Sequence, residues 1–352
     1  MHKLFLLLLL LSSNCYQVFS QTAQMRYVFL DNYTIGTDGK IGQLSLRHPD
    51  SEMKFILKGK NRNMFLIKDN QLFLKKNYFK EKDKWIDIIV EAGNGKHTHA
   101  SEFRILYNGF LKNKVIAHRG AWKNTNATEN SIAALKHAIA IGCEGSEFDI
   151  HMSSDSVPVI HHDSHIGKVL IDETKSIDLQ KLKLGSGEPL PTLKSYLLAG
   201  MKQNNTKLIL EIKPSALGKQ RSIELTRKVV EMVEQLKAQA WVDYISFDYD
   251  VLKEVLRLDP FAKCSYLKGD NPPEQVAADN MYGIDYNYSV YQKNPDWITK
   301  AQQHKLTVNV WTVNDSSMLD FFLEQNVDFI TTNEPELLLK KVSKGLRVKG
   351  ER

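Results

Sequence analysis

From Lys112 onward the chain alternates short β-branched strands with helical stretches, and this alternation constrains the fold most. Strands such as LILEIK and VNVWTV are separated by stretches such as ENSIAALKHAIAIG and RSIELTRKVVEMVEQLKAQ. Alternation of this kind is typical of a parallel sheet with helices packed outside it, so we predict an α/β fold. In the last such segment, NDSSMLDFFLEQN, Asn314 is expected to be the helix N-cap.

Nine segments after Lys112 have strand composition, one more than a closed eight-stranded barrel needs. They are VIAHRG (115–120), SEFDIH (146–151), VPVIHHD (157–163), LILEIK (208–213), YISFD (244–248), KCSYL (263–267), GIDYNY (283–288), VNVWTV (308–313) and DFITTN (328–333). Only MSSDS joins the second segment to the third, whereas parallel neighbours need a crossover of about a dozen residues. VPVIHHD is therefore expected to fold back as a hairpin arm. Eight strands within residues 111–345 then predict a (β/α)8 barrel, a TIM-type fold.

Residues 21–110 have a different rhythm, in which apolar residues alternate with period two. Runs such as MKFILKG, WIDIIVEAG and SEFRILYN are separated by turn signals such as Asp-Gly and Gly-Asn-Gly. This pattern predicts a small antiparallel β-sandwich. Its spacing is similar to cadherin-like or immunoglobulin-like modules, although the clustered acidic motif of a calcium-binding cadherin repeat is missing. We expect a structural or docking role, for example at a surface or a glycan.

Residues 1–20 have the pattern of a secretory signal peptide, with a basic start, an apolar core and small residues before Gln21. The apolar core is too short to span a bilayer, so no transmembrane segment is expected. Export would place the protein in a periplasm or outside the cell. A lipoprotein anchor at Cys15 is less favoured, because Asn14 precedes it where a small residue is usual.

The composition excludes several classes of function. The net charge of +6 comes mostly from a C-terminal basic run, which includes the predicted solvated tail 346–352, so no basic surface for nucleic acid is expected. Once the leader is removed, the remaining cysteines are Cys143 and Cys264, with no CxxC spacing. A disulfide framework or a cysteine metal site is therefore not expected.

Acidic side chains at the ends of two predicted strands indicate a cation site. Glu147 and Asp149 are two residues apart, so their side chains point to the same side of the strand, and Glu211 lies on the next barrel strand. A set of carboxylates favours a hard divalent cation, Mg²⁺ or Ca²⁺. The alternative is that Lys213 or Arg119 bridges these carboxylates without a metal.

Two histidines at the same predicted edge are candidates for acid–base catalysis. His118 ends the first strand and His162 ends the hairpin arm. The adjacent His161 would face the other side of the extended arm, so His162 is preferred. Arg119 and Lys213 could bind the oxygens of a phosphoryl group as charge develops on them.

Taken together, these motifs resemble those of the glycerophosphodiester phosphodiesterase family. VIAHRG, ATENS, GCEGSEFDIHMSSDSVPVIHHD, LPTL, LILEIK, YISFD, VNVWTVN and VDFITTNEP follow one another in the order typical of that family. The resemblance implies a (β/α)8 barrel with an inserted arm. The implied site has a divalent cation on Glu147, Asp149 and Glu211, acid–base residues His118 and His162, phosphate contacts from Arg119 and Lys213, and pocket residues Trp311, Glu129 and Asn130.

Three positions depart from the family pattern. Thr128 stands where a proline usually precedes Glu129 and Asn130, Phe148 stands where an aliphatic residue is usual, and Asn333 stands where aspartate is common. The first departure could shift the loop that carries Glu129 and Asn130.

The predicted activity is metal-dependent hydrolysis of small glycerophosphodiesters, the deacylated phospholipids, to glycerol 3-phosphate and an alcohol. The attacking group could be water or a neighbouring hydroxyl of the substrate. Two alternatives stay open: a phospholipase D-like enzyme acting on lyso- or sphingo-phospholipids, and a surface binding protein on a barrel that has lost its activity.

Overall fold

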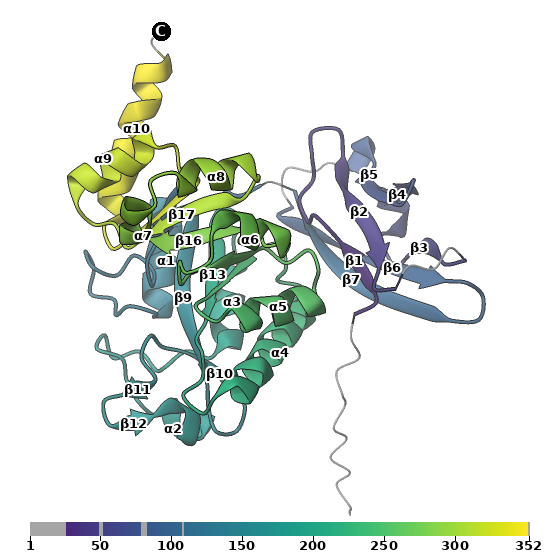
Figure 1. Ribbon diagram of the computed structural model, residues 1–352. Helices are drawn as coiled ribbons and strands as arrows, with labels where there is room; N and C mark the ends of the chain where they lie inside the picture. The colour runs from purple at the N-terminus through teal and green to yellow at the C-terminus, as the bar shows by residue number, and fades with distance from the viewer. Residues whose placement is uncertain (1–25, 49–51, 79–82, 108, 351–352) are drawn as a thin grey trace, which may run out of the picture.

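The computed structural model describes residues 26–48, 52–78, 83–107 and 109–350, which form two units in contact (Figure 1). The predicted leader and Cys15 lie outside the described residues. Strands of the first unit extend from Val28 to Leu106, and those of the second begin at Val115. The structure has no described helix that combines the length and the hydropathy needed to cross a bilayer.

The N-terminal unit consists of two antiparallel sheets with the strand orders β1-β2-β5-β4 and β3-β6-β7. Their inward residues form the core, as the strict alternation of buried and half-buried residues along β6 shows. The strands are β1 (Val28–Leu30), β2 (Lys40–Leu46), β3 (Lys54–Lys58), β4 (Phe65–Lys68), β5 (Gln71–Leu74), β6 (Trp85–Gly93) and β7 (Thr98–Leu106), with short 3₁₀ turns η1 (Arg62–Met64) and η2 (Lys76–Tyr78).

The second unit is a closed barrel of eight parallel strands, as the sequence predicted. The last strand pairs with the first and the first with the second, so the barrel has no free edge. Its strands are β8 (Val115–Ala117), β9 (Gly145–Met152), β13 (Lys207–Ile212), β14 (Val242–Ser246), β15 (Cys264–Tyr266), β16 (Gly283–Asn287), β17 (Thr307–Trp311) and β18 (Phe329–Thr332).

The segment VPVIHHD is the predicted hairpin arm. Its strand β10 (Pro158–Ile160) pairs antiparallel with the end of β9, with Pro158 opposite Met152. The arm continues as β11 (His165–Ile166), β12 (Val169–Leu170), η3 (Ile171–Glu173) and α2 (Ser176–Leu179). The arm therefore rises from the C-terminal end of the barrel strands, beside the predicted catalytic residues.

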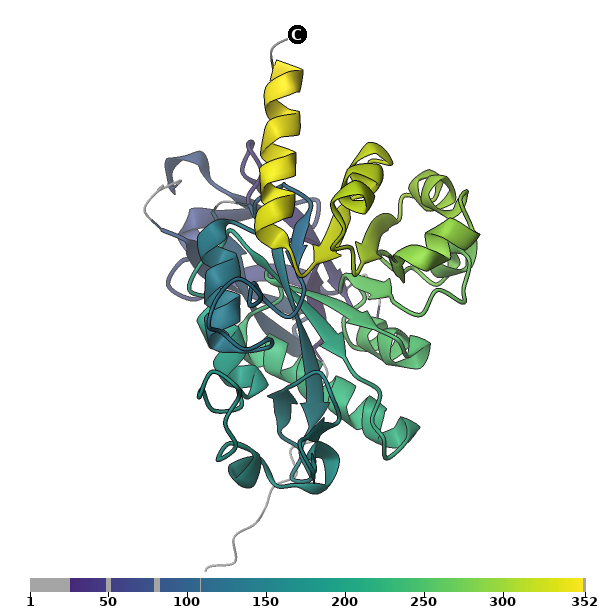
Figure 2. The same cartoon turned by 90° about the vertical axis from the view of Figure 1, so that its left-hand side faces the viewer.

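The helices pack outside the barrel (Figures 1 and 2). They are α1 (Ile132–Ile141), α3 (Leu193–Gly200), α4 (Lys219–Leu236), α5 (Tyr249–Leu258), α6 (Pro273–Ala278), α7 (Tyr288–Lys293), α8 (Trp297–Gln303), α9 (Ser316–Glu324) and α10 (Pro335–Gly350). The N-cap of α9 is Asp315 and not Asn314, so that prediction was wrong by one residue. Asn314 instead accepts hydrogen bonds from Thr332 and Asn333.

The boundary predicted at residue 345 falls inside α10, which continues to Gly350. Cys143 and Cys264 are both buried and unbonded.

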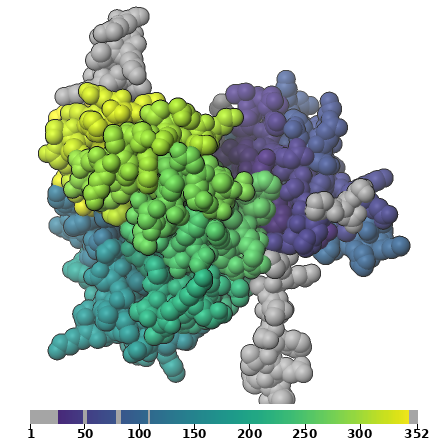
Figure 3. Space-filling model, in the orientation of Figure 1, coloured from purple at the N-terminus to yellow at the C-terminus, as the bar shows by residue number. Residues whose placement is uncertain are grey.

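The N-terminal unit packs against the barrel unit (Figure 3), and its contacts are with residues that lie just before β14 and β15, at the end where the barrel strands begin. Arg26 lies 2.6 Å from Asp259, and Lys237 lies 2.8 Å from Asp87. The Arg47 guanidinium donates to the carbonyls of Arg257 and Leu258 at the end of α5, at 2.9 and 2.7 Å. The C-terminal ends of α4 and α5 lead into the N-terminal ends of β14 and β15. These contacts are therefore at the N-terminal end of the barrel, opposite the end that carries the predicted catalytic residues.

Candidate active site

The C-terminal ends of the barrel strands surround one cavity of about 120 Å³. One half is lined by charged and imidazole groups from β8, β9, β13 and the arm, and the other half is largely apolar. The lining residues are His118, Arg119, Glu147, His162, Glu211, Lys213, Ile245, Phe247, Leu267, Asp285, Trp311, Thr312 and Thr331. Seven of the ten residues predicted from the sequence are among them, so one cavity unites the proposed chemistry.

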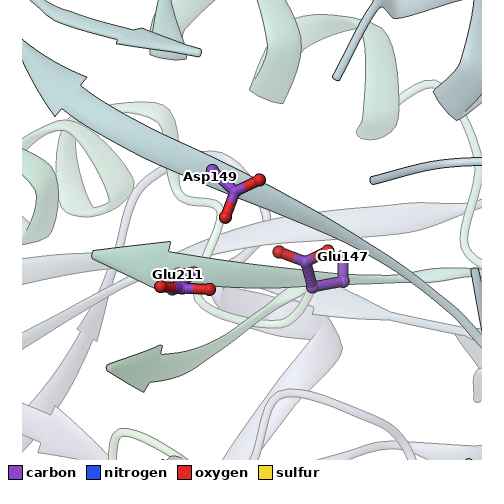
Figure 4. A group of neighbouring side chains, drawn as sticks. All are labelled: Glu147, Asp149 and Glu211. Carbon is purple, nitrogen blue, oxygen red and sulfur yellow. The ribbon is translucent and has the colours of Figure 1, made fainter. Parts of the chain in front are cut away.

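Three carboxylates meet at the charged side of this cavity. Glu147 and Asp149 extend from β9, and Glu211 from the adjacent β13, where it lies opposite Asp149 in the sheet register (Figure 4). One oxygen of each lies within 4.8 Å of the others. All three residues are buried, which makes their ionised forms costly unless a cation is near.

A lysine and an asparagine neutralise and hold Asp149. Lys213 Nζ lies 2.8 Å from Asp149 and 2.7 Å from Glu211, so it bridges the two carboxylates. Asn130 donates to Asp149 at 2.7 Å and accepts from its backbone amide at 3.1 Å. Burial alone would raise the pKa of Asp149, but Lys213 and Asn130 lower it to about 2. Asp149 is therefore ionised at neutral pH.

The other two carboxylates are less well compensated. Burial, followed by repulsion from Asp149, raises the pKa of Glu211 to about 8. Burial and the charges of Asp149 and Glu211 raise the pKa of Glu147 well above its usual range. Glu147 Oε2 accepts from the amide of Arg119 at 2.8 Å, but its Oε1 is buried and has no hydrogen-bond partner among the described residues.

This arrangement fits a divalent cation better than a lysine bridge alone. Lys213 forms ion pairs with only two of the three acids, and Oε1 of the third, Glu147, has neither an ion pair nor a hydrogen bond among the described residues. An oxygen-only set of closely spaced carboxylates suits Mg²⁺ or Ca²⁺. A divalent cation among these oxygens would also lower their raised pKa values, because it stabilises the ionised forms.

The HRG sequence places Arg119 in a tight turn beside the carboxylates. Arg119 has φ +57° and Gly120 has φ +81°. A Cβ atom at Gly120 would lie 2.7 Å from Cβ of Ala134, so only glycine fits against α1. The turn directs the Arg119 amide to Glu147, while the guanidinium is held by Glu129 at 2.9 and 3.0 Å.

The loop with Thr128 in place of the family's proline still brings Glu129 and Asn130 to the site. Asn130 has φ +60° and donates its amide hydrogen to Arg119 O instead of lining the cavity. Asn130 therefore positions Asp149 and does not itself line the cavity. Ser131, the next residue, caps α1 by accepting from the amide of Ala134 at 3.0 Å.

His118 has the environment of a neutral base. Its Nδ1 lies 2.8 Å from Asn333 Oδ1, an acceptor, so Nδ1 carries the proton and Nε2 keeps a free lone pair. Desolvation and the nearby Arg119 charge lower the pKa of His118 to about 4, although the hydrogen bond with Asn333 acts in the opposite direction. The ring is thus uncharged at neutral pH.

His162 has a different partner, because its Nδ1 lies 2.7 Å from the carboxylate of Asp163. The carboxylate accepts from Nδ1 and so leaves Nε2 as the ring nitrogen available to another group. The His162 carbonyl accepts a hydrogen bond from Nε2 of the buried His151 at 3.1 Å, which fixes the arm against β9. His161 interacts with the Asp163 carbonyl through Nδ1 and does not line the cavity, whereas His162 does.

Trp311 and Phe247 form the apolar half of the cavity together with Ile245 and Leu267. The two aromatic rings meet edge to face with centroids 5.5 Å apart. Trp311 Nε1 donates to the carbonyl of Asp285 at 2.8 Å, so its one polar atom is satisfied and the ring is fixed.

Sequence reasoning missed several residues of the site. His151 and Asp163, which hold His162, stand inside the quoted motif but give no separate signal. Asn333 was noticed only as a departure from the family pattern, whereas the structure places it on His118. Asp285 was not considered at all, although a charged residue inside GIDYNY, an otherwise buried strand, was a signal.

Comparisons with known proteins identify relatives of the barrel unit. A profile described as the glycerophosphoryl diester phosphodiesterase family matches residues 118–337. The chain is 28% identical over 251 residues to a glycerophosphodiester phosphodiesterase of Caldanaerobacter subterraneus subsp. tengcongensis, a match covering 67% of this chain and all of the relative. A crystal structure of a glycerophosphodiester phosphodiesterase from Parabacteroides distasonis is similar with a TM-score of 0.65 and 39% identity, over 68% of this chain and all of the other.

A third relative was solved with a bound product. It is an Oleispira antarctica phosphodiesterase in complex with sn-glycerol-3-phosphate, similar with a TM-score of 0.56 and 25% identity over 66% of this chain and 96% of the other. The family match lies within the barrel unit and begins at His118.

Proposed function

The chain belongs to the glycerophosphoryl diester phosphodiesterase family, and we propose that it hydrolyses glycerophosphodiesters to glycerol 3-phosphate and an alcohol in a metal-dependent reaction. The observation that carries this proposal is the convergence of three buried carboxylates and two differently partnered histidines on one cavity. A cavity of about 120 Å³ favours small, deacylated substrates such as glycerophosphocholine or glycerophosphoethanolamine, with part of the molecule outside the cavity, over diesters with acyl chains.

Glu147, Asp149 and Glu211 are the residues that would hold the cation. When bound, a divalent cation supplies positive charge next to the phosphoryl oxygens, where negative charge grows during displacement. Arg119 contributes to the same task, since its Nε is buried, lies 3.7 Å from Asp149 and makes no hydrogen bond within the described residues. Lys213 adds a second positive group at the cavity wall.

The two histidines divide the proton transfers. His118 is neutral and has a free Nε2, so it removes the proton from the attacking hydroxyl, either water or a neighbouring hydroxyl of the substrate. His162, paired with Asp163, protonates the oxygen of the departing alcohol. Asn333 and Asp163 act by fixing which ring nitrogen faces the substrate.

An assay of glycerol 3-phosphate release tests the proposal. The protein is treated with EDTA, then supplied with Mg²⁺ or Ca²⁺ and offered glycerophosphodiesters with different alcohols. We expect activity to vanish on chelation and to return with one of the cations. His118→Ala should lower kcat about 10²- to 10⁴-fold. His137→Ala is the matched control, because that ring contacts Glu336 outside the cavity, and it should keep wild-type activity. Full activity in EDTA would refute the metal role.

An observation favours one alternative substrate, a lysophospholipid. Ile177 on the arm and Leu217 in the loop after β13 are 61% and 54% exposed, and the hydrogen bond from Ser215 to Asp172 joins these two segments. Such apolar side chains could contact a membrane. Faster turnover of lysophosphatidylcholine than of glycerophosphocholine would support this alternative. Cleavage of neither, with both cations supplied, would support a binding protein without activity.

For the rest of the chain, we propose that the protein acts after export, on the basis of the leader pattern in residues 1–20. We also propose a structural or docking role for the N-terminal unit, because it contacts the barrel at the end remote from the site.

A further inference from the structure

A buried carboxyl group outside the proposed catalytic set lies at the floor of the cavity. Asp285 on β16 is only 2% exposed, and its Oδ1 has no hydrogen-bond partner among the described residues. It lines both the active-site cavity and a smaller cavity below it in the barrel interior. An unsatisfied buried carboxyl oxygen is costly, so its presence needs an explanation.

The surroundings of Asp285 do not provide that explanation. The adjacent Asn309 and Thr331 hydrogen-bond to each other, at 3.0 and 3.3 Å, and the walls above are the apolar side chains of Ile245 and Leu267. Burial raises the pKa of Asp285 to about 7, with hydrogen bonding from Asn309 acting in the opposite direction. Within the described residues, no basic side chain forms an ion pair with it.

We propose that Asp285 is the residue that recognises the glycerol part of the substrate, by hydrogen-bonding a glycerol hydroxyl at the floor of the apolar half of the cavity. This inference rests on the proposed function. The phosphate would lie against the carboxylates, Arg119 and Lys213, and the three-carbon chain would extend along Trp311 and Phe247 toward Asp285. The glycerol phosphate part is common to all the substrates, so it belongs in the enclosed space, whereas the variable alcohol faces the opening.

A hydroxyl fits this position better than the cationic end of choline or ethanolamine. A carboxyl with a pKa near neutrality is often uncharged, and an uncharged carboxyl gains little from a cation. A quaternary ammonium also has no hydrogen to donate to Oδ1. A hydroxyl can donate to a carboxylate and can both donate to and accept from a carboxylic acid, so it satisfies Asp285 in either state.

The experiment compares Asp285→Leu with Asp285→Asn on three kinds of diester. Leucine preserves the approximate size but removes hydrogen bonding, whereas asparagine retains an acceptor. We expect Asp285→Leu to lower kcat/KM for glycerophosphocholine and glycerophosphoglycerol equally, by about ten- to a hundredfold and mainly through KM, because a polar group built for a substrate hydroxyl is lost. Turnover of bis(4-nitrophenyl) phosphate, which has no glycerol, should stay within about twofold. Asp285→Asn should recover part of the loss.

Two outcomes would overturn the inference. Equal losses with and without glycerol would mean that Asp285 only supports the fold, and a loss confined to choline or ethanolamine esters would place it on the cationic alcohol instead. Asp243→Asn is the matched control, since Asp243 is also a buried-strand aspartate but lies on β14, two strands from β16 and at the opposite end of the barrel, beside Lys207. It should leave the ratio of the substrates unchanged.

A binding measurement separates this inference from the proposed function. If the wild-type protein cleaves no diester, the proposed function fails. Calorimetry with the metal-supplied protein then still compares sn-glycerol 3-phosphate with inorganic phosphate. We expect the preference for sn-glycerol 3-phosphate to fall at least tenfold in Asp285→Leu, with the affinity for inorganic phosphate retained. An unchanged preference would overturn the role of Asp285.

Discussion

The two ends of the barrel both contain buried charges, but they balance them differently. At the N-terminal end, Lys207 lies 2.9 Å from Asp243, and Glu144 accepts from the amides of Asn113 and Lys114 at 2.7 Å each. At the C-terminal end, the ammonium of Lys213 pairs with only two of the three acids, Asp149 and Glu211, and one carboxylate oxygen of the third, Glu147, has no hydrogen-bond partner among the described residues. Both ends contain buried charged groups. Only at the end that carries the proposed site do the described acidic groups outnumber the cations and hydrogen-bond donors that compensate them.

A buried charge that stabilises the fold differs in its surroundings from a buried charge that serves binding or catalysis. The acids of the N-terminal end are compensated within the protein, and the N-terminal unit packs over that end. At the C-terminal end, Lys213 and Asn130 compensate Asp149, whereas burial and mutual repulsion leave the pKa values of Glu147 and Glu211 raised. Removing a charge should therefore have opposite consequences for stability and activity at the two ends.

The largest effect is expected from a pair of matched changes, Glu147→Gln and Glu144→Gln. Glu147→Gln should lower kcat/KM more than about 10³-fold and weaken cation binding, because a ligand charge is lost. In EDTA it should also raise the free energy of unfolding at pH 8, since a buried carboxylate with a raised pKa is removed. Assays of activity, titration calorimetry with Mg²⁺ and urea unfolding measure these three quantities.

Glu144→Gln should behave in the opposite way. The charge-assisted hydrogen bonds to the amides of Asn113 and Lys114 weaken, which should cost about 1–2 kcal/mol of stability. Activity should stay within about twofold. If both variants lost stability and kept activity, the functional contrast between the two ends would be wrong.

The second effect concerns the pH dependence of activity through Asn333→Asp. An aspartate would place a negative charge beside Nδ1 of His118, now 2.8 Å from Oδ1 of Asn333, and would raise the pKa of that imidazole from about 4. A base is inactive when protonated, so the acidic limb of kcat/KM should move to higher pH. We expect about a tenfold loss relative to wild type at pH 5.5, and little change at pH 8.

The control for this shift adds the same charge at the other end of the barrel. Asn326 is next to Lys114, whose Nζ lies 3.3 Å from the Asn326 side chain. Asn326→Asp should therefore leave the pH profile of activity as it is in the wild-type protein. An unchanged profile in Asn333→Asp would mean that His118 is not the base.

Much of the fold and of the site could be predicted because local rules determine them. The number of barrel strands followed from strand composition, and the arm at VPVIHHD followed from the five-residue connection MSSDS, which is too short for a crossover. The convergence of Glu147, Asp149 and Glu211 followed from alternation along β9 and from strand order. These rules state on which side of a strand a residue lies.

Other features depend on contacts between distant parts of the chain. Asn333 reaches His118 because the last strand closes the barrel on the first, and Arg26 reaches Asp259 across 233 residues. Local patterns do not specify which polar side chain meets which, because rotamers and the docking of the two units decide this. The same limit explains why the sequence left two positions open for Lys213, at phosphate or between carboxylates, and the structure shows it at the cavity wall between Asp149 and Glu211.

The smallest expected effect tests how complete the balance at the N-terminal end is. Burial lowers the pKa of Lys207 to about 8 even though Asp243 favours the charged form. The unfolded chain, with an ordinary lysine pKa near 10.5, therefore binds more protons than the folded protein between pH 8 and 10.5, and the free energy of unfolding rises with pH in that window. Lys207→Met should abolish this rise, about 1–3 kcal/mol in total, as measured by urea unfolding between pH 7 and 10. Asp243 keeps a cation in this variant, since it also raises the pKa of Lys263. The control is Lys219→Met, a change at an exposed lysine, which should keep the wild-type dependence of the free energy of unfolding on pH. If Lys207→Met also kept that dependence, Lys207 would be fully compensated by its partner.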